Sequence, residues 1–181
     1  FVISGPSGAG KGTLVTRVRE RRSNLGLTVS ATTRAPRKGE VDGVNYFFLT
    51  REEFDRRVAN GEFVEWAEVH GNCYGTLVSE VTSKLASGAS LILEIDVQGA
   101  LQVKERFPEA VLIFIKPPSL EVLRERLVGR GTETPETIEL RMANAADELA
   151  LADRYDDVVV NDVLDRATDE LVRVLDMHER I

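Results

Sequence analysis

The sequence predicts an α/β fold: a three-layer core with a parallel sheet in its middle, interrupted by a smaller inserted subdomain. Four apolar segments that read as buried strands alternate with amphipathic helical segments, which is typical of parallel sheets covered on both faces. A glycine-rich loop joins the first strand to the first helix. Between 30 and 88 the alternation gives way to short segments, which indicates an inserted mixed or antiparallel sheet. The four core strands are expected at 1–3, 90–96, 111–115 and 157–160.

The helices of the core follow from apolar periodicity and from capping signals. Leu14, Val15 and Val18 share one face of the first helix, and Ser119 caps a helix in the second half of the chain. The glycines and the proline of 129–135 form a connection with the composition of a hinge. The core helices are expected at 11–22, 97–106, 120–128, 135–153 and 164–179.

The inserted segment contains its own helix and strand signals. Thr50 and Glu53 form a capping box that starts a helix at 51–59. The alternation of 63–69 predicts a strand with Phe63, Glu65, Ala67 and Val69 on one face and Val64, Trp66 and Glu68 on the other. The remaining expected elements are strands at 27–30 and 44–49, a turn at 71–76 and a helix at 77–86.

Bulk composition excludes several classes of protein. A chain of 181 residues, 43% of them hydrophobic, is long enough for one domain with a real core. The net charge of −7 argues against nucleic acid and acidic membranes as partners, but it permits a small anionic ligand. Cys73 is the only cysteine, so we expect no internal disulfide and a reducing, cytoplasmic location. No signal peptide or membrane-length apolar run is apparent, and the start at Phe1, inside a strand, leads us to expect a natural N-terminus further upstream.

The loop after the first strand has the features of a phosphate-binding loop. Its glycines allow successive backbone N–H groups to point at one oxyanion, and the N-terminus of the following helix adds partial positive charge. Lys11 is placed to bridge the outer phosphates of a nucleoside triphosphate. The predicted phosphate-binding residues are Gly5, Pro6, Ser7, Gly8, Ala9, Gly10, Lys11, Gly12 and Thr13.

One position departs from the usual pattern of this loop. Serine or threonine normally follows the lysine and binds magnesium, whereas Gly12 stands there and the hydroxyl comes one residue later, at Thr13. The sequence of residues 10–13, Gly-Lys-Gly-Thr, resembles the corresponding motif of adenylate kinases. The magnesium ligand therefore stays open between Thr13 and water held by Asp96.

A second signature narrows the family. Ser30-x-Thr-Thr-Arg-x-Pro-Arg-x-Gly-Glu40 is followed by Gly43-x-x-Tyr46, by Glu65-Trp66 and by Tyr74-Gly-Thr76. Together with the phosphate loop, this combination resembles guanylate kinases over essentially the whole chain. The other departures are Thr76 where a serine is frequent and Cys73 where an aromatic is frequent.

The resemblance implies an enzyme that transfers a phosphoryl group from ATP to GMP, giving ADP and GDP, with Mg²⁺ accompanying ATP. It implies a single domain, 1–181, in which 30–88 is the GMP-binding insertion and 126–137 is the lid. The core then consists of 1–29, 89–125 and 138–181. Oligomeric state is not implied.

The resemblance also assigns residues to the two substrates. Arg34 and Arg37, with Tyr46 and Tyr74, bind the GMP phosphate, and guanidinium forks suit that group chemically. Glu65 is the guanine reader, with Ser30 and Thr76 as hydroxyl partners, because a carboxylate matches the adjacent N1–H and N2–H₂ donors of guanine. The predicted GMP-binding residues are Ser30, Arg34, Arg37, Tyr46, Glu65, Tyr74, Thr76, Glu94 and Asp96.

Charge neutralisation on the transferred group carries most of the chemistry of phosphoryl transfer. The resemblance gives the catalytic roles to Lys11, Arg34, Arg130 and Arg141, and adds Arg130 and Asn161 to the ATP site. Three residues keep two readings each from the sequence. Arg126 either supports the lid arginines or pairs with a neighbour on its own helix. Glu94 either holds water molecules bound to magnesium or forms a salt bridge. Asn161 either contacts adenine or is an ordinary turn residue.

Two other functions compete with this interpretation. The first is a kinase for another nucleoside monophosphate, which the set of arginines, tyrosines and Glu65 disfavours. The second is a guanylate-kinase-like scaffold domain that binds phosphopeptides without catalysis, which the intact phosphate loop disfavours. His70 and His178 are too isolated to predict a metal site.

Overall fold

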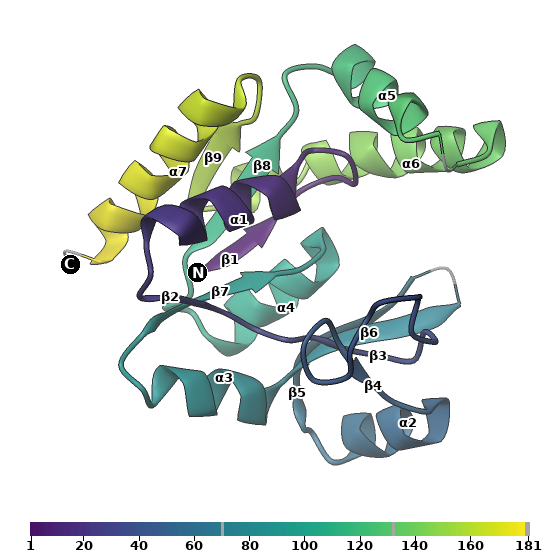
Figure 1. Ribbon diagram of the computed structural model, residues 1–181, viewed down its shortest axis with the longest axis vertical. Coiled ribbons are helices and arrows are strands. Elements are labelled where there is room, and N and C mark those ends of the chain that lie inside the picture. Colours follow the sequence, from purple (N-terminus) through teal and green to yellow (C-terminus); the bar gives the residue numbers. More distant parts are fainter. Residues whose placement is uncertain (70, 132, 180–181) are drawn as a thin grey trace.

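The computed structural model describes residues 1–69, 71–131 and 133–179 and has two parts, a larger core and a smaller insertion (Figure 1). A five-stranded sheet lies in the middle of the core, in the order β2-β7-β1-β8-β9, and every neighbouring pair is parallel. This confirms the predicted parallel α/β core. Its strands are β1 (Val2–Ser4), β2 (Leu25–Leu27), β7 (Ser90–Glu94), β8 (Leu112–Lys116) and β9 (Asp157–Val160).

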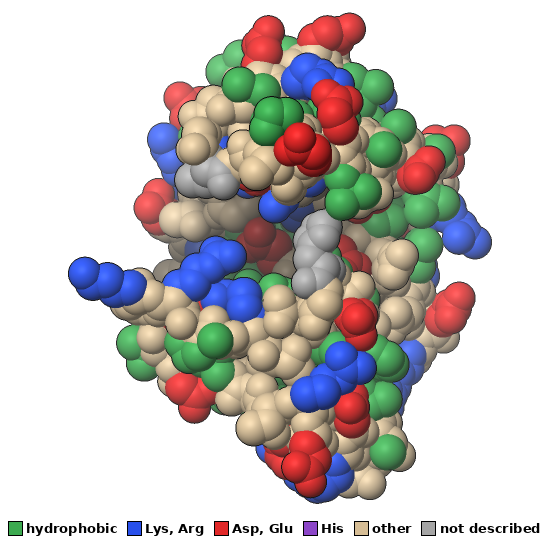
Figure 2. All heavy atoms as spheres, turned by 90° about the vertical axis from the view of Figure 1, so that its right-hand side faces the viewer, with side chains coloured by type: hydrophobic (Ala, Val, Ile, Leu, Met, Phe, Trp, Pro, Cys, Tyr) green, Lys and Arg blue, Asp and Glu red, His purple; other side chains and the backbone are tan. Residues whose placement is uncertain are grey.

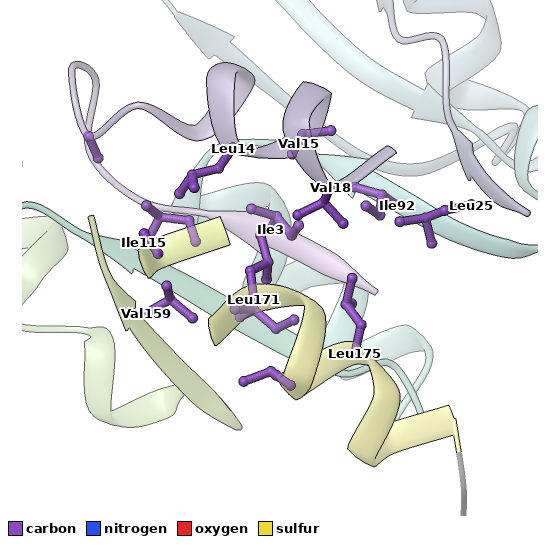
Figure 3. Packing of buried hydrophobic residues seen from close by; sticks show 14 residues of the cluster. Ile3, Leu14, Val15, Val18, Leu25, Ile92, Ile115, Val159, Leu171 and Leu175 are labelled. Atoms are coloured by element: carbon purple, nitrogen blue, oxygen red, sulfur yellow. The ribbon is translucent and has the colours of Figure 1, made fainter. Parts of the chain in front are cut away.

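The two faces of this sheet build two hydrophobic clusters, because alternate strand residues point to opposite sides. On one face, side chains such as Ile3 and Ile115 pack against α1 (Lys11–Arg21) and α7 (Leu164–Glu179), as Figure 3 shows. On the other face, Val2 and Phe114 pack with residues of α4 (Val97–Arg106). The three layers predicted from the sequence are therefore present.

The insertion is a four-stranded mixed sheet in the order β4-β3-β6-β5. Only the β3–β4 pair is parallel. Phe54 of α2 (Arg51–Ala59) is fully buried and stacks on Phe63, with 4.4 Å between ring centroids. The strands are β3 (Ala31–Thr32), β4 (Phe47–Phe48), β5 (Phe63–Val69) and β6 (Asn72–Leu77), and α3 (Val78–Leu85) leads back to the core.

Two further helices extend the core above the insertion (Figure 1). They are α5 (Leu120–Gly129) and α6 (Pro135–Leu149), and Leu123 and Leu127 of the first pack with Ile138 and Ala145 of the second. A 3₁₀ turn at Ala152–Arg154 precedes β9. The connection between α5 and α6 is the predicted lid.

The N-terminal ends of several helices agree with the capping signals in the sequence. Ser119 accepts the backbone N–H of Val122, and Thr50 accepts that of Glu53. These bonds satisfy backbone donors that the first turn of a helix leaves free. The starts of α5 and α2 therefore lie where the sequence places them.

Four of the predicted elements were wrong in extent or type. The strand expected at 27–30 lies at Leu25–Leu27, where it pairs with β7, and the chain then enters β3 at Ala31. The strand expected at 44–49 contains only Phe47–Phe48. The turn expected at 71–76 is largely strand β6, because β5 and β3 supply backbone partners on both its sides. The helix expected at 135–153 ends at Leu149.

The predicted faces of β5 were also wrong. Phe63 and Trp66 both lie against Phe54, whereas Val64 packs in the core cluster beside α4 and Glu65 lies against α4. A shift in the β5–β6 register between Phe63 and Glu65 breaks the alternation there. Such a bulge re-aims the side chains that follow it.

Within the described ranges, no helix is both long and apolar enough to cross a membrane. The same residues contain no group of three or more His, Cys, Asp or Glu side chains that could hold a metal ion by themselves. His178 contacts Asp157, with 2.6 Å between Nε2 and Oδ2. His70 lies outside the described residues.

Candidate active site

The carboxyl-terminal ends of β1 and β7 bring the predicted functional residues to one edge of the core sheet. Ile3 and Glu94 are partners in the parallel register, so the phosphate loop leaves the sheet beside Glu94 and Asp96. The insertion faces this edge. Figure 2 shows that side of the molecule hollowed between the two parts, with basic side chains near the rim and acidic ones deeper.

The phosphate loop depends on glycine at two close approaches. Gly5 and Gly10 have φ values of 146° and 89°, which other residues rarely adopt. A Cβ at Gly5 would lie 2.2 Å from the carbonyl oxygen of Ile115, and one at Gly10 would lie 2.4 Å from Nδ2 of Asn161. Both positions therefore require glycine for conformation and for space.

Lys11 folds back over this loop. Its Nζ donates to the carbonyl oxygens of Gly5 and Pro6, at 2.6 and 3.2 Å. Burial lowers the pKa of Lys11, and the nearby carboxylates, Glu94 first among them, oppose that effect. The lysine is thus placed inside the loop, next to the acids that follow β7.

A network from the end of β9 holds the loop in position. The buried Asn161 donates through Nδ2 to the carbonyl oxygen of Ala9 at 2.8 Å, and its own backbone N–H is bonded to Lys116. Arg126 of α5 donates to the carbonyl oxygen of Asn161 at 2.8 Å. This contact beside the loop is neither of the two roles that the sequence suggested for Arg126.

The lid arginines approach the loop from α5 and α6. Arg141 contacts Ser7 Oγ and forms an ion pair with Glu133, with 2.9 Å between Nε and Oε2. Arg130, at the end of α5, is exposed, and its charge contributes to lowering the pKa of Lys11. Positive charge thus gathers around the loop from three segments.

The acceptor half of the cleft contains an arginine held by a carboxylate. Arg34 donates from NH1 and NH2 to the two oxygens of Glu40, at 3.0 and 2.9 Å. Its guanidinium carbon lies 5.3 Å from the ring centroid of Tyr46, and that ring is 6.1 Å from the ring of Tyr74. The structure therefore brings Arg34, Tyr46 and Tyr74 together, as the sequence predicted.

Arg37 is placed differently from Arg34. Its side chain is exposed, whereas its backbone N–H donates to Glu40 at 2.8 Å. The hydrogen bonds from Arg34 are the main reason that the pKa of Glu40 is lowered. Glu40 thus links the two arginines: it accepts two hydrogen bonds from the guanidinium group of Arg34 and one from the backbone N–H of Arg37.

Glu65 is the most deeply buried carboxylate of the cleft. Only 5% of the residue is exposed, and Oε1 accepts the hydroxyl of Thr76 at 2.7 Å, across the β5–β6 pair. Burial raises its pKa to about 7, with repulsion from Asp96 adding to the shift and the bonds from Thr76 opposing it. Ser30 precedes β3, and its carbonyl oxygen accepts the N–H of Phe47.

Two acidic residues at the end of β7, Glu94 and Asp96, have different surroundings. Asp96 caps α4 by accepting the N–H of Gly99 at 2.8 Å. Glu94 is half-buried, and a Cβ at Gly12 would lie 3.4 Å from its Oε1. Burial raises the pKa of Glu94, and the charge of Lys11 opposes the shift. Glu94 therefore occupies the space beside the residue that lacks the usual hydroxyl.

Sequence reasoning assigned no role to two residues that the structure places in the site. Glu40 lay inside the quoted signature, and its position six residues after Arg34 in a proline-stiffened loop was the available signal. Glu148 of α6 is close enough to influence Lys11 electrostatically. No local pattern marks Glu148, because its position depends on how α6 packs.

Comparison with known proteins gives consistent findings. The family model of guanylate kinase matches residues 1–178. Guanylate kinase of Gloeobacter violaceus is 57% identical over 97% of this chain and 85% of its own length, and that of Halalkalibacterium halodurans is 53% identical over 97% and 86%. The crystal structure of guanylate kinase from Anaplasma phagocytophilum aligns with a TM-score of 0.78 at 39% identity, covering 97% of this chain and 83% of that one.

Proposed function

The chain belongs to the guanylate kinase family, and we infer that it is an enzyme that transfers a phosphoryl group from ATP to GMP, giving ADP and GDP. The observation that carries this function is the buried carboxylate of Glu65, which is bonded to Thr76 on the same strand that brings Tyr74 to the cluster around Arg34. A carboxylate that can accept two N–H donors and a cation for a monophosphate fit GMP as the acceptor, and the phosphate loop together with the family supports ATP as the donor.

The donor half binds ATP through backbone N–H groups of 7–13, with Lys11 on the outer phosphates. In free enzyme, Lys11 is held by the carbonyl oxygens of Gly5 and Pro6, so it is already oriented toward the loop. Arg130 and Arg141 add positive charge from the lid. Asn161 supports the ATP site through the carbonyl oxygen of Ala9.

The acceptor half binds GMP through two groups of residues. Arg34, Arg37, Tyr46 and Tyr74 take the phosphate, and the fork between Arg34 and Glu40 fixes the guanidinium plane before the substrate arrives. Ser30, Glu65 and Thr76 take the base, with Asp96 and Glu94 at the edge nearest the donor. Prior orientation of this kind reduces the entropy lost when GMP binds.

Phosphoryl transfer here consists mainly of positioning and of neutralising charge. Lys11, Arg130 and Arg141 stabilise charge on the moving group, and Arg34 holds the acceptor phosphate in line. Strong general-base catalysis is not required, and Asp96 is the candidate for any weak base contribution. The contacts of Lys11 with two carbonyl oxygens must be exchanged for contacts with phosphate as ATP binds.

Magnesium enters with ATP, and the residues present suit a metal bound chiefly by phosphates and water. Carboxylate and hydroxyl oxygens are ligands that Mg²⁺ prefers, and the described residues form no cluster that would bind it alone. Asp96 and Glu94 would hold its water shell, and Thr13 would be the nearby hydroxyl. The metal supplies neutralisation of phosphate charge when bound.

The division of the chain follows from these two halves. Residues 30–88 form the GMP-binding insertion and 126–137 the lid, with Thr132 outside the described residues. The core comprises 1–29, 89–125 and 138–181. The enzyme acts in the cytoplasm, a location that its single cysteine favours.

The test is a coupled assay with MgATP and each of GMP, AMP, CMP and UMP. We expect GMP to be phosphorylated, with kcat/KM for AMP lower by a factor of roughly 30 to 1,000, the cost of leaving a buried carboxylate unpaired. Equal activity on AMP and GMP would overturn the assignment of guanine recognition. Binding of GMP without turnover in the presence of MgATP would favour the nonenzymatic alternative.

A further inference from the structure

Gly99 stands in α4 where the backbone does not require glycine. It is the third residue of the helix and is absent from the glycines with positive φ. Alanine is the better helix former at such a position, because glycine loses more conformational freedom on folding. Some feature other than helix formation therefore favours glycine here.

Space is that feature. A Cβ at Gly99 would lie 2.4 Å from Oε2 of Glu65 and 3.0 Å from its Cδ, and 3.4 Å from Oδ1 of Asp96. The three nearest atoms thus all belong to the carboxyl groups of two predicted GMP-site residues. The first two distances are far below van der Waals contact, so a side chain at 99 and the present position of Glu65 exclude each other.

The surrounding structure prevents the strand from moving away. On its outer edge, the backbone of Trp66 in β5 exchanges two hydrogen bonds with the side chain of Gln102 in α4, at 3.1 and 3.0 Å. On the inner side, Oε1 of Glu65 is held by Thr76. The part that can yield is the end of the Glu65 side chain, which is flexible, so a Cβ at Gly99 displaces the carboxylate and leaves the fold intact.

We propose that Gly99 is a positioning residue for guanine recognition, because its missing side chain provides the space in which the Glu65 carboxylate lies. The inference rests on the proposed role of Glu65 as the guanine reader. It makes residue 99 a determinant of specificity although residue 99 offers no group to the base. Asp96 contributes to the same arrangement by capping the turn that contains Gly99.

The first experiment is Gly99→Ala, measured by steady-state kinetics and thermal unfolding. Because misplacement of a binding group by roughly 1 Å costs up to about 100-fold, we expect KM for GMP to rise by roughly 10- to 100-fold. KM for ATP should change by less than about twofold, since the new Cβ would clash only with Glu65 and would make an ordinary contact with Asp96, at 3.4 Å. The preference for GMP over AMP should fall with the GMP effect, and Tm should stay unchanged or rise. Gln98→Ala, an exposed neighbour in the same turn, is the matched control and should behave as wild type.

The second experiment asks whether Gly99 acts through Glu65. In a Glu65→Ala background the obstructing carboxylate is gone, so Gly99→Ala should cause no further rise in KM for GMP, which a double-mutant cycle measures. If Gly99→Ala fails to fold but the double variant folds, the clash is confirmed by stability instead. If both fail to fold, or if the two substitutions raise KM independently, the inference is wrong.

Failure of the inference and failure of the proposed function give different results. If Glu65→Ala raises KM for GMP while Gly99→Ala leaves it unchanged, Glu65 reads guanine and Gly99 does not position it. If wild type shows no preference for GMP, or Glu65→Ala leaves GMP kinetics unchanged, the assignment of Glu65 itself is wrong.

Discussion

The two halves of the cleft are built by different means. The phosphate loop of the donor half is a single stretch, 5–13, whose shape comes from the backbone: Gly5 and Gly10 adopt left-handed φ values, and Asn161 holds the loop through the carbonyl oxygen of Ala9. The acceptor half is assembled from residues far apart in the sequence. Its carboxylate, Glu65, depends on β6 for a hydrogen bond and on α4 for space.

This difference assigns different tasks to the halves. A loop of backbone donors binds any triphosphate, so its side chains matter mainly for the charge that develops during transfer. A buried carboxylate beside fixed arginines discriminates between bases, because an incorrect base leaves buried polar groups unpaired. We therefore expect donor-half substitutions to lower turnover and acceptor-half substitutions to lower selectivity.

The largest expected effect is in the donor half. Lys11→Met removes the cation nearest the transferred group, and we expect kcat to fall by roughly two to four orders of magnitude with little change in KM for GMP. Lys116→Met, which alters an exposed lysine at the end of β8, is the control. A folded Lys11→Met enzyme with near-normal kcat would contradict the division of tasks.

The next effect belongs to the acceptor half. Glu65→Gln keeps the shape of the side chain but removes the charge, so kcat/KM for GMP should fall by roughly 30- to 1,000-fold while that for the poor substrate AMP falls far less. Both constants are measured with both proteins. Equal losses for the two nucleotides would make Glu65 a structural residue.

A smaller effect separates the two arginines of the insertion. Arg34→Lys retains charge but cannot form the fork with Glu40 or lie flat on Tyr46, so KM for GMP should rise by about tenfold. Arg37→Lys should raise KM by only about twofold, because that side chain is exposed and Glu40 contacts only its backbone. Equal effects would show that Glu40 does not orient Arg34.

The same contrast explains what the sequence could predict. The phosphate loop and the capped helix starts at Thr50 and Ser119 are local, so their residue patterns were sufficient. Strand β6 was predicted as a turn, because its strand character comes from partners in β3 and β5 rather than from Gly71 or Asn72. The roles of Glu40 and Gly99 depend on contacts with Arg34 and Glu65 in the folded chain. The sequence could therefore suggest residue types for guanine recognition, but it could not suggest Gly99, whose proposed role depends on a contact in the folded chain.

The last predicted effect, comparable in size to that of Arg34→Lys, tests whether the acceptor half alone responds to pH. Burial raises the pKa of Glu65 from its ordinary value of 4.5 to about 7, and Asp96 is the charged neighbour that adds to the shift. A protonated carboxyl group presents an O–H to the N–H donors of guanine, so GMP requires the ionised form. Between pH 6 and 8 the ionised fraction rises by about tenfold, and KM for GMP should fall by about that factor.

Stability should fall between pH 4.5 and about 7, whereas affinity for GMP rises with pH. The folded pKa of Glu65 lies above the unfolded one, so between pH 4.5 and about 7 the native state holds a proton that the unfolded state has released. The contribution of this group to stability is then fully present below pH 4.5 and is lost as pH rises toward 7.

Glu65→Gln should flatten both the pH profile of KM for GMP and this part of the pH profile of Tm. The second ionisation of the GMP phosphate, with a pKa near about 6, remains in both proteins and serves as the internal control. If the variant retains the full wild-type slope in KM, the titrating group is the phosphate, and the carboxylate of Glu65 is ionised throughout.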